Sequence, residues 1–171
     1  MQTLDLAWRD AWAQRIQALQ ASAGEHALAD LSADNLYLFR QAHGYQFFEG
    51  EWPLVIGHTY DGTSHAIPLF DVAKVPTQIL ASLLQQHGCL YPLSASQKQA
   101  WEHAHPGLPV HWASVRDDAD YVYTGESFET YDGLHAKRNL VKQLLAVHTV
   151  QAQPYSLAVA ADALLILQGW L

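Results

Sequence analysis

The chain is poor in cysteine and in basic residues. It has one cysteine, Cys89, in 171 residues, which excludes an intrachain disulfide framework and suits a reducing compartment, so we expect a cytoplasmic protein. It has no run of about 18 apolar residues that would span a membrane, and no basic segment followed by an apolar one that would indicate a signal peptide. Nine Lys and Arg against 17 Asp and Glu give a formal net charge of −8. Because such a field repels nucleic acids and anionic membranes, an anion site must be a local patch.

Half of the residues are hydrophobic, which is ample for a packed core. Their periodicity predicts helices over residues 5–22, 32–42 and 76–87 and a further helix around Trp101. Between them, short β-rich runs predict a meander of two antiparallel hairpins over residues 45–48, 54–59 and 65–70. We expect three further short strands over residues 89–92, 110–115 and 121–123.

This order predicts an α+β or α/β fold, with a mixed, largely antiparallel sheet flanked by helices. The layout resembles a GNAT (N-acetyltransferase-like) domain over residues 1–133. Residues 134–171 then predict a helix, a strand over 149–153 and an apolar helix from residue 157, which we interpret as the truncated opening of a second similar domain. Such an apolar helix must be buried, either by a missing second domain or neighbouring subunit, or by docking on its own core.

The candidate binding residues begin with a basic helix in which Lys137, Arg138 and Lys142 supply three of the nine positive charges. His135, Arg138 and Lys142 share one helical face, and Asn139 adds a polar contact. Arg138 suits bidentate binding of a phosphate or carboxylate, and Lys142 adds a point charge one turn later. The alternative is a solvated face, or pairing with upstream acids: Asp118, Asp120 and Asp132.

No metal site is expected. Asp118 and Asp120 point to one side of a predicted strand, but two carboxylates are too few for cation ligation. His103, His105 and His111 have no cysteine or carboxylate to complete a tetrahedral zinc site. Cys89 lies in an apolar run without basic neighbours, so we expect a buried, inert thiol.

Six segments spread over nearly the whole chain share one resemblance. They are Asn35-Leu-Tyr-Leu-Phe, Tyr60-Asp-Gly, Pro68-Leu-Phe-Asp, Tyr91-Pro-Leu, Asp118-Ala-Asp-Tyr-Val-Tyr and Lys137-Arg-Asn-Leu-Val-Lys-Gln-Leu. Together they resemble the phosphatidylglycerol lysyltransferase C-terminal domain family, whose smaller bacterial members form a domain of unknown function. The resemblance implies a tandem of two GNAT-like domains, and its better-known relatives move an aminoacyl group from aminoacyl-tRNA to a lipid headgroup or peptide. It also implies that Asp120, Tyr121 and Tyr123 line the cleft between the domains.

The chain departs from GNAT enzymes at Pro76, where a glycine-rich loop would hold the coenzyme A pyrophosphate through backbone N–H groups. We therefore expect no cofactor in this chain, while acyl-CoA or aminoacyl-tRNA remains a possible donor for the full-length protein. The resulting hypothesis is the first part of an acyl- or aminoacyl-transferase-like protein, inactive as this fragment, with a small-molecule or lipid-headgroup acceptor and unassigned catalytic residues. The alternative is a non-catalytic ligand-binding or dimerisation module of GNAT-like shape.

Overall fold

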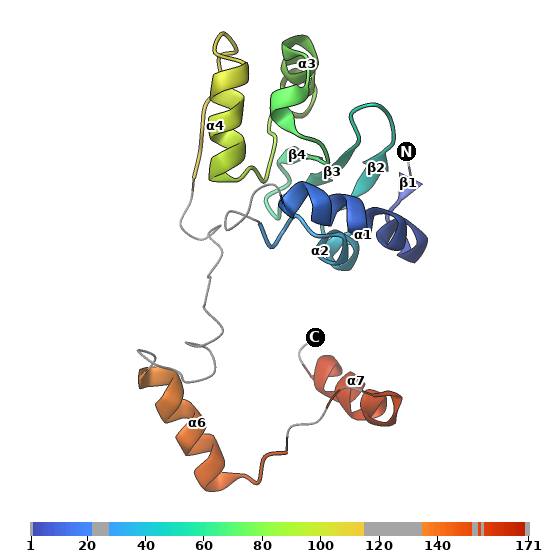
Figure 1. Ribbon diagram of the computed structural model, residues 1–171. Helices are drawn as coiled ribbons and strands as arrows, with labels where there is room; N and C mark the ends of the chain where they lie inside the picture. Colours follow the sequence, from blue (N-terminus) through green and yellow to red (C-terminus); the bar gives the residue numbers. More distant parts are fainter. Residues whose placement is uncertain (1, 22–27, 115–134, 152–153, 155, 170–171) are drawn as a thin grey trace. The chain divides into compact units, whose positions relative to one another are not determined.

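The computed structural model describes residues 2–21, 28–114, 135–151, 154 and 156–169 (Figure 1). The chain divides into two compact units, Met1–Asp120 and Tyr121–Leu171. The boundary predicted from the sequence, after Gly133, lies outside the described residues.

The first unit is built on a four-stranded antiparallel sheet in the order β1-β2-β3-β4. Its strands are β1 (Gln2–Thr3), β2 (Gln46–Phe48), β3 (Leu54–His58) and β4 (Ser64–Pro68). Phe47 pairs with Val55, and Val55 pairs with Ile67, so the predicted meander of two hairpins is confirmed. The sequence did not predict β1, because two residues are too few to show a strand period.

Helices cover both faces of this sheet (Figure 1). Val55 and its neighbour Leu54 point to opposite faces and belong to two different hydrophobic clusters. The helical elements of the unit are α1 (Leu6–Ala21), α2 (Ala33–Phe39), η2 (Val72–Lys74), α3 (Thr77–His87) and α4 (Ala95–Ala104). The cluster around Val55 includes residues of α1 and α2, and the cluster around Leu54 includes residues of α3 and α4. The α+β prediction, with an antiparallel sheet flanked by helices, is confirmed.

Local sequence signals explain where these helices lie. Trp8, Trp12 and Ile16 of α1 are buried at helical spacing, and the ring of Trp12 lies 4.7 Å from that of Phe47. Helix α2 begins after Ser32, whose hydroxyl accepts a hydrogen bond from the backbone N–H of Asn35 at 3.1 Å. The predicted capping box at the start of α4, made by Ser94 and Gln97, is also confirmed.

Two predicted strands are absent from the described residues. Residues 110–114 are irregular. Trp112 packs on Trp101 with ring centroids 5.8 Å apart, so the hydrophobic pattern of this segment comes from packing on one side and not from pairing with another strand. Residues 89–92 contribute a single parallel bridge between Leu90 and Ala66. Pro68, at the next position of β4 that would donate to this segment, has no N–H to extend that ladder. The predicted strand over residues 121–123 lies outside the described residues.

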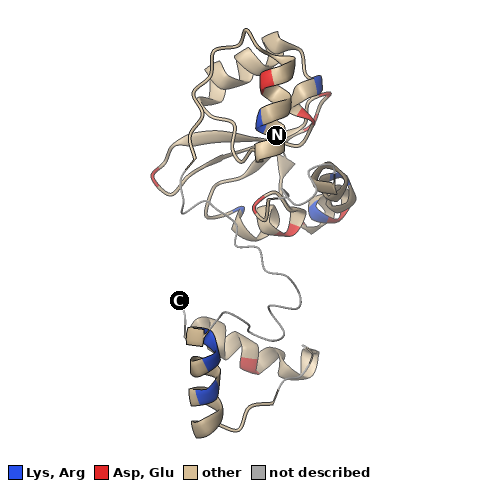
Figure 2. Cartoon of the chain, turned by 60° about the vertical axis from the view of Figure 1, so that its left-hand side comes forward, with Lys and Arg blue, Asp and Glu red and all other residues tan. Residues whose placement is uncertain are grey.

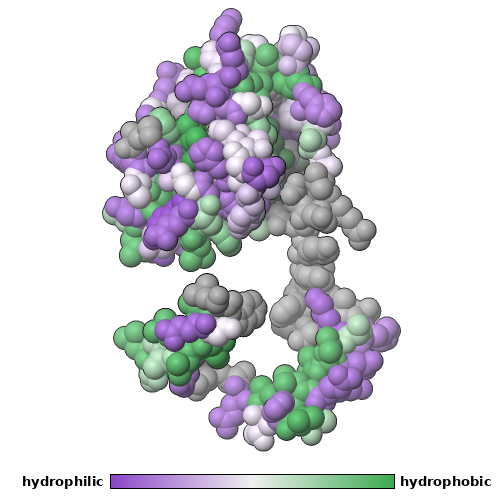
Figure 3. Space-filling model, turned by 180° about the vertical axis from the view of Figure 1, so that it is seen from behind, coloured by the Kyte–Doolittle hydropathy of each residue, from purple (hydrophilic) through white to green (hydrophobic). Residues whose placement is uncertain are grey.

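The second unit contains α6 (His135–Val147), η4 (Leu157–Val159) and α7 (Ala160–Gln168). Both predicted helices are present, whereas residues 149–151 form no strand and residues 152–153 lie outside the described part. No residue of α6 or α7 is buried, and hydrophobic surface is visible on the unit (Figure 3). Its exposed large hydrophobic residues are Leu140, Val141, Leu144, Leu145, Val147, Val150, Leu157, Leu164, Leu165, Ile166 and Leu167. The interpretation of this unit as an opening second domain stays a prediction.

Candidate functional site

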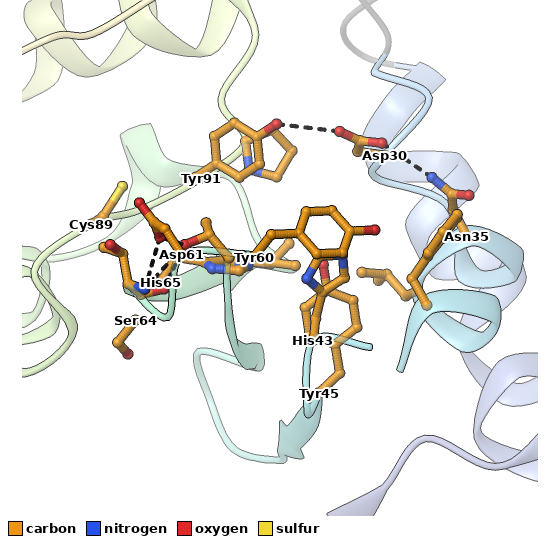
Figure 4. Close-up of a pocket in the computed structure, with 16 residues that line it drawn as sticks. Asp30, Asn35, His43, Tyr45, Tyr60, Asp61, Ser64, His65, Cys89 and Tyr91 are labelled. Atoms are coloured by element: carbon orange, nitrogen blue, oxygen red, sulfur yellow. Dashed lines mark hydrogen bonds between the residues drawn. The ribbon is translucent and has the colours of Figure 1, made fainter. Parts of the chain in front are cut away.

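A pocket of about 600 Å³ lies in the first unit, at the turn between β3 and β4 (Figure 4). Four segments distant in sequence form it: residue 30 with helix α2, the chain after α2, the β3–β4 turn with β4, and the chain after α3. Aromatic and imidazole rings make much of its wall. Its lining residues are Asp30, Asn35, Leu36, Phe39, His43, Tyr45, Thr59, Tyr60, Asp61, Thr63, Ser64, His65, Ile67, Cys89, Tyr91 and Pro92.

Asp30 connects two of these segments. Its carboxylate accepts a hydrogen bond from the hydroxyl of Tyr91 at 3.3 Å and another from the side-chain amide of Asn35 at 3.2 Å (Figure 4). Asn35 is held in the first turn of α2 by the Ser32 cap. The carboxylate is therefore positioned by two uncharged donors, each of them fixed by its own segment.

His65 of β4 is the most deeply buried polar residue of the pocket wall, with 3% of its surface exposed. Its ring lies edge-on to those of Tyr45 and Tyr91, with centroids 6.0 and 5.9 Å away and interplanar angles of 88°. Neither ring nitrogen has a hydrogen-bond partner among the described residues. A buried polar atom without a partner is uncommon in native proteins and calls for a physical explanation.

The charge state of this imidazole follows from its surroundings. Burial lowers the pKa of His65, and the nearby imidazoles of His43 and His58 lower it further. The backbone of Thr63 raises the pKa and offsets part of this shift, although it forms no hydrogen bond with either ring nitrogen. His65 is therefore uncharged at neutral pH. A neutral imidazole offers one N–H donor and one acceptor nitrogen.

Tyr45, His43 and Tyr60 form a second wall of rings. The imidazole of His43 lies 5.1 Å from the ring of Tyr45 and 4.7 Å from that of Tyr60. Nδ1 of His43 is 2.8 Å from the carbonyl oxygen of His58. Because a carbonyl oxygen only accepts, Nδ1 donates the proton in this hydrogen bond. Burial raises the pKa of Tyr45 to about 12, with smaller contributions from Asp30 and Tyr60.

The β3–β4 turn holds a second carboxylate, that of Asp61. It accepts hydrogen bonds from the hydroxyl of Thr59 and from the backbone N–H of Thr63, the latter at 3.0 Å. These hydrogen bonds, first that of Thr59, lower the pKa of Asp61 to about 2. Gly62, at φ +85°, allows the tight turn that presents Tyr60, which is 83% exposed. The turn thus places a permanent negative charge beside an exposed aromatic ring.

Cys89 lines the same pocket, but the expectation of a buried thiol was wrong, because the residue is exposed. It follows Gly88, which ends α3, and its neighbour Leu90 forms only one bridge with β4, so no strand of the described residues covers the thiol. Partial burial of the sulfur raises the pKa of the thiol. The thiol is thus mostly protonated at neutral pH and a weak nucleophile.

The residues singled out from the sequence lie elsewhere. Lys137, Asn139 and Lys142 are exposed on α6, and Arg138 is half-buried. The lysine and arginine positions of this helix are blue in Figure 2. The predicted helix, and therefore the shared face of His135, Arg138 and Lys142, is present. The remaining candidates, Asp120, Tyr121 and Tyr123, lie outside the described residues.

The pocket residues were not among the sequence candidates, although one signal pointed to them. Three of the segments that resemble the lysyltransferase family supply pocket residues, namely residues 35–39, 60–62 and 91–93. What the sequence could not indicate is His65, because its isolation from hydrogen-bond partners depends on the folded packing.

The histidines considered for zinc do not gather. His105 is 6% exposed, with Nδ1 2.9 Å from the hydroxyl of Thr77 and Nε2 3.0 Å from the carbonyl oxygen of Val72. It therefore joins α4 to the start of α3 and to η2, as a core histidine with both nitrogens bonded. Across the described ranges, no group of three His, Cys, Asp or Glu residues is arranged to hold a metal ion.

No family model, curated protein or solved structure matches the chain. The resemblance to the lysyltransferase family therefore stays a prediction. Within the part of the chain that the structure covers, no helix combines the length and the apolar character needed to cross a bilayer.

Proposed function

We propose that the first unit is a binding module for a small organic molecule, which it holds in the pocket at the β3–β4 turn. The observation that carries the proposal is His65, a buried imidazole in the wall of a cavity of about 600 Å³ with neither nitrogen bonded among the described residues. Leaving such a group unsatisfied costs about 1–3 kcal/mol. A ligand with a hydroxyl or amide group would remove that cost on binding if the ring turned a nitrogen toward it, because both nitrogens are closed to solvent in the free protein.

The construction of the pocket supports the same proposal. Ligand sites are typically concave and largely apolar, with a few polar groups directed inward. Here Leu36, Phe39 and Ile67 supply apolar surface, while Asp30 and His65 supply the polar groups. Asp30 is already oriented by Tyr91 and Asn35, so little ordering remains to oppose binding.

The proposal can be tested by nuclear magnetic resonance on the full chain with labelled histidine, using a library of small fragments. We expect a subset of fragments to shift the ring signals of His65 and His43 in a saturable manner, and His65→Leu to weaken their binding. His103→Gln is the matched control, because His103 is exposed on α4 and does not line the pocket. If no fragment shifts the His65 signals, or if both variants weaken binding equally, the proposal is contradicted.

The second candidate function is acyl or aminoacyl transfer, in which the pocket would hold the acceptor. The observation that favours it is the uncharged state of His65, because a neutral imidazole can take a proton from an amine nucleophile. In the second unit, taken by itself, the basic face of α6 with Arg138 and Lys142 suits an anionic ligand. In this candidate the donor remains acyl-CoA or aminoacyl-tRNA, the acceptor is a small molecule or lipid headgroup, and the protein is cytoplasmic.

The same candidate assigns a covering partner to the second unit. The exposed apolar residues of α6 and α7, including Leu144 and Leu165, suit burial by a further domain or by a neighbouring subunit. Mass spectrometry separates the two candidates, by following acyl transfer from acetyl-CoA or aminoacyl-tRNA to a pocket-bound amine. An acylated product that disappears in His65→Leu supports transfer, whereas a saturated pocket without product leaves binding as the function of this chain.

A further inference from the structure

The lining of the pocket is acidic. Its lining contains two carboxylates, Asp30 and Asp61, and no lysine or arginine. Among the described residues neither carboxylate forms an ion pair, and both accept hydrogen bonds from uncharged hydroxyl, amide or backbone groups. A phosphate or carboxylate ligand would meet repulsion here, whereas a cation would meet two uncompensated negative charges.

The rings around these carboxylates favour the same kind of ligand. Tyr45, Tyr60 and Tyr91 each line the pocket, and the face of an aromatic ring attracts a cation held within about 6 Å of its centre. The negative surroundings also raise the pKa of Tyr45, because Asp30 adds to the effect of burial. The net charge of −8 draws cations toward the chain from a distance.

The third part of the pocket is His65. Tyr91 joins it to the acidic end, because the Tyr91 hydroxyl bonds Asp30 while its ring contacts the imidazole of His65. A ligand that spans the pocket therefore meets a carboxylate and ring faces at one end and an unbonded imidazole at the other.

We propose that the pocket binds an organic cation, whose ammonium group lies against Asp30 and the tyrosine rings while a hydroxyl or amide group hydrogen-bonds His65. This inference rests on the proposed binding function and adds the chemical class of the ligand. It does not require that the ligand be a substrate.

The experiment compares three probes of similar size in nuclear magnetic resonance titrations of the full chain. The probes are choline, its carbon isostere in which the ammonium nitrogen is replaced by carbon, and the anion gamma-hydroxybutyrate. All three carry a hydroxyl for His65. Choline and its isostere have the same shape, so the difference between these two reports the charge alone. We expect choline to bind about tenfold more tightly than the neutral isostere, and the anion not to bind.

Two substitutions localise the effect. Asp30→Asn should remove most of the preference for choline over its isostere, whereas Asp34→Asn should leave it unchanged. Asp34 is the matched control because it is exposed on α2, carries the same charge and does not line the pocket. Equal binding of choline and the isostere would overturn the cation inference while supporting the binding function. Absence of binding by all three probes would overturn the inference, and the fragment library then decides the binding function separately.

Discussion

The ring of Tyr45 occupies the space that a side chain at Gly57 would need. A Cβ atom placed on Gly57 would overlap Cδ1 and Cε1 of Tyr45 and would lie 3.1 Å from the carbonyl oxygen of His43. Gly57 is the fourth of the five residues of β3 and has no positive φ, so its role is steric. The aromatic wall of the pocket thus packs directly against strand backbone, and only glycine at position 57 permits it.

Gly57→Ala should therefore displace Tyr45. We expect a loss of about 1–3 kcal/mol in the free energy of unfolding, as for other substitutions that overfill a packed site. Binding of pocket fragments should weaken in parallel, since Tyr45 lines the pocket. Chemical denaturation and the fragment titration measure the two effects. Gly50→Ala is the control, because nothing lies within 4 Å of a Cβ at Gly50, and equal losses for both variants would contradict the steric role.

Two buried histidines make a matched pair for a second prediction. His65→Leu removes two nitrogens that form no hydrogen bond, and burial of the leucine side chain offsets the lost ring contacts. The free energy of unfolding should therefore change by less than about 1 kcal/mol. His105→Leu breaks bonds to Thr77 and Val72, and should cost about 2–4 kcal/mol. Denaturant unfolding at pH 8 compares them. A loss at His65 as large as that at His105 would assign His65 a structural role.

The pH dependence of stability provides a third prediction. Burial lowers the pKa of His65 in the folded state, and the unfolded chain has the ordinary value of about 6.5. The unfolded state therefore takes up a proton first, so the contribution of His65 to stability is present above about pH 6.5 and is lost as the pH falls below it. The groups near His65 that titrate or carry charge are His43, His58, Tyr45, Tyr91, Cys89, Asp30 and Asp61.

The measurement is the free energy of unfolding between about pH 8 and about pH 5 for the wild type and His65→Leu. The variant should lose less stability on acidification. His87, whose pKa burial also lowers, is unchanged in both proteins and contributes equally. Parallel pH profiles would show that folding does not lower the pKa of His65, and would contradict the prediction.

The second unit gives a fourth prediction. Leu165 and Ile166 of α7 are 66% and 67% exposed, and isolated short helices are marginally stable in water. We expect the mass measured by sedimentation to rise with concentration, and Leu165→Glu to suppress the rise. Gln168→Glu introduces the same charge at a polar position of α7 and should have little effect. A constant monomer mass would exclude a second copy as the covering partner.

Much of the fold could be predicted because its signals are local. The stripe of Trp8, Trp12 and Ile16, the caps at Ser32 and Ser94, and the turn at Asp61-Gly62 each act within a few residues. Over residues 110–114 the predicted strand was wrong, because a hydrophobic pattern records which side chains pack and Trp112 packs on Trp101 without a strand partner.

The pocket could not be predicted from the sequence, for a different reason. Asp30 and Tyr91 are 61 residues apart, and no local pattern indicates that their side chains meet. The binding site was instead predicted at clusters of charge such as Lys137 and Arg138, because these are conspicuous in an acidic chain. A buried imidazole without hydrogen-bond partners leaves no such mark in the sequence, because the lack of partners is visible only in the folded packing.

The most direct test of the account is the nitrogen spectrum of the His65 imidazole in the free protein and during titration with a pocket-binding fragment. The account predicts a neutral ring at neutral pH, with neither nitrogen strongly hydrogen-bonded in the free protein and one nitrogen shifting as the fragment saturates. A nitrogen already strongly bonded to the protein, or a spectrum unchanged at saturation, would contradict the central claim that His65 is reserved for a ligand.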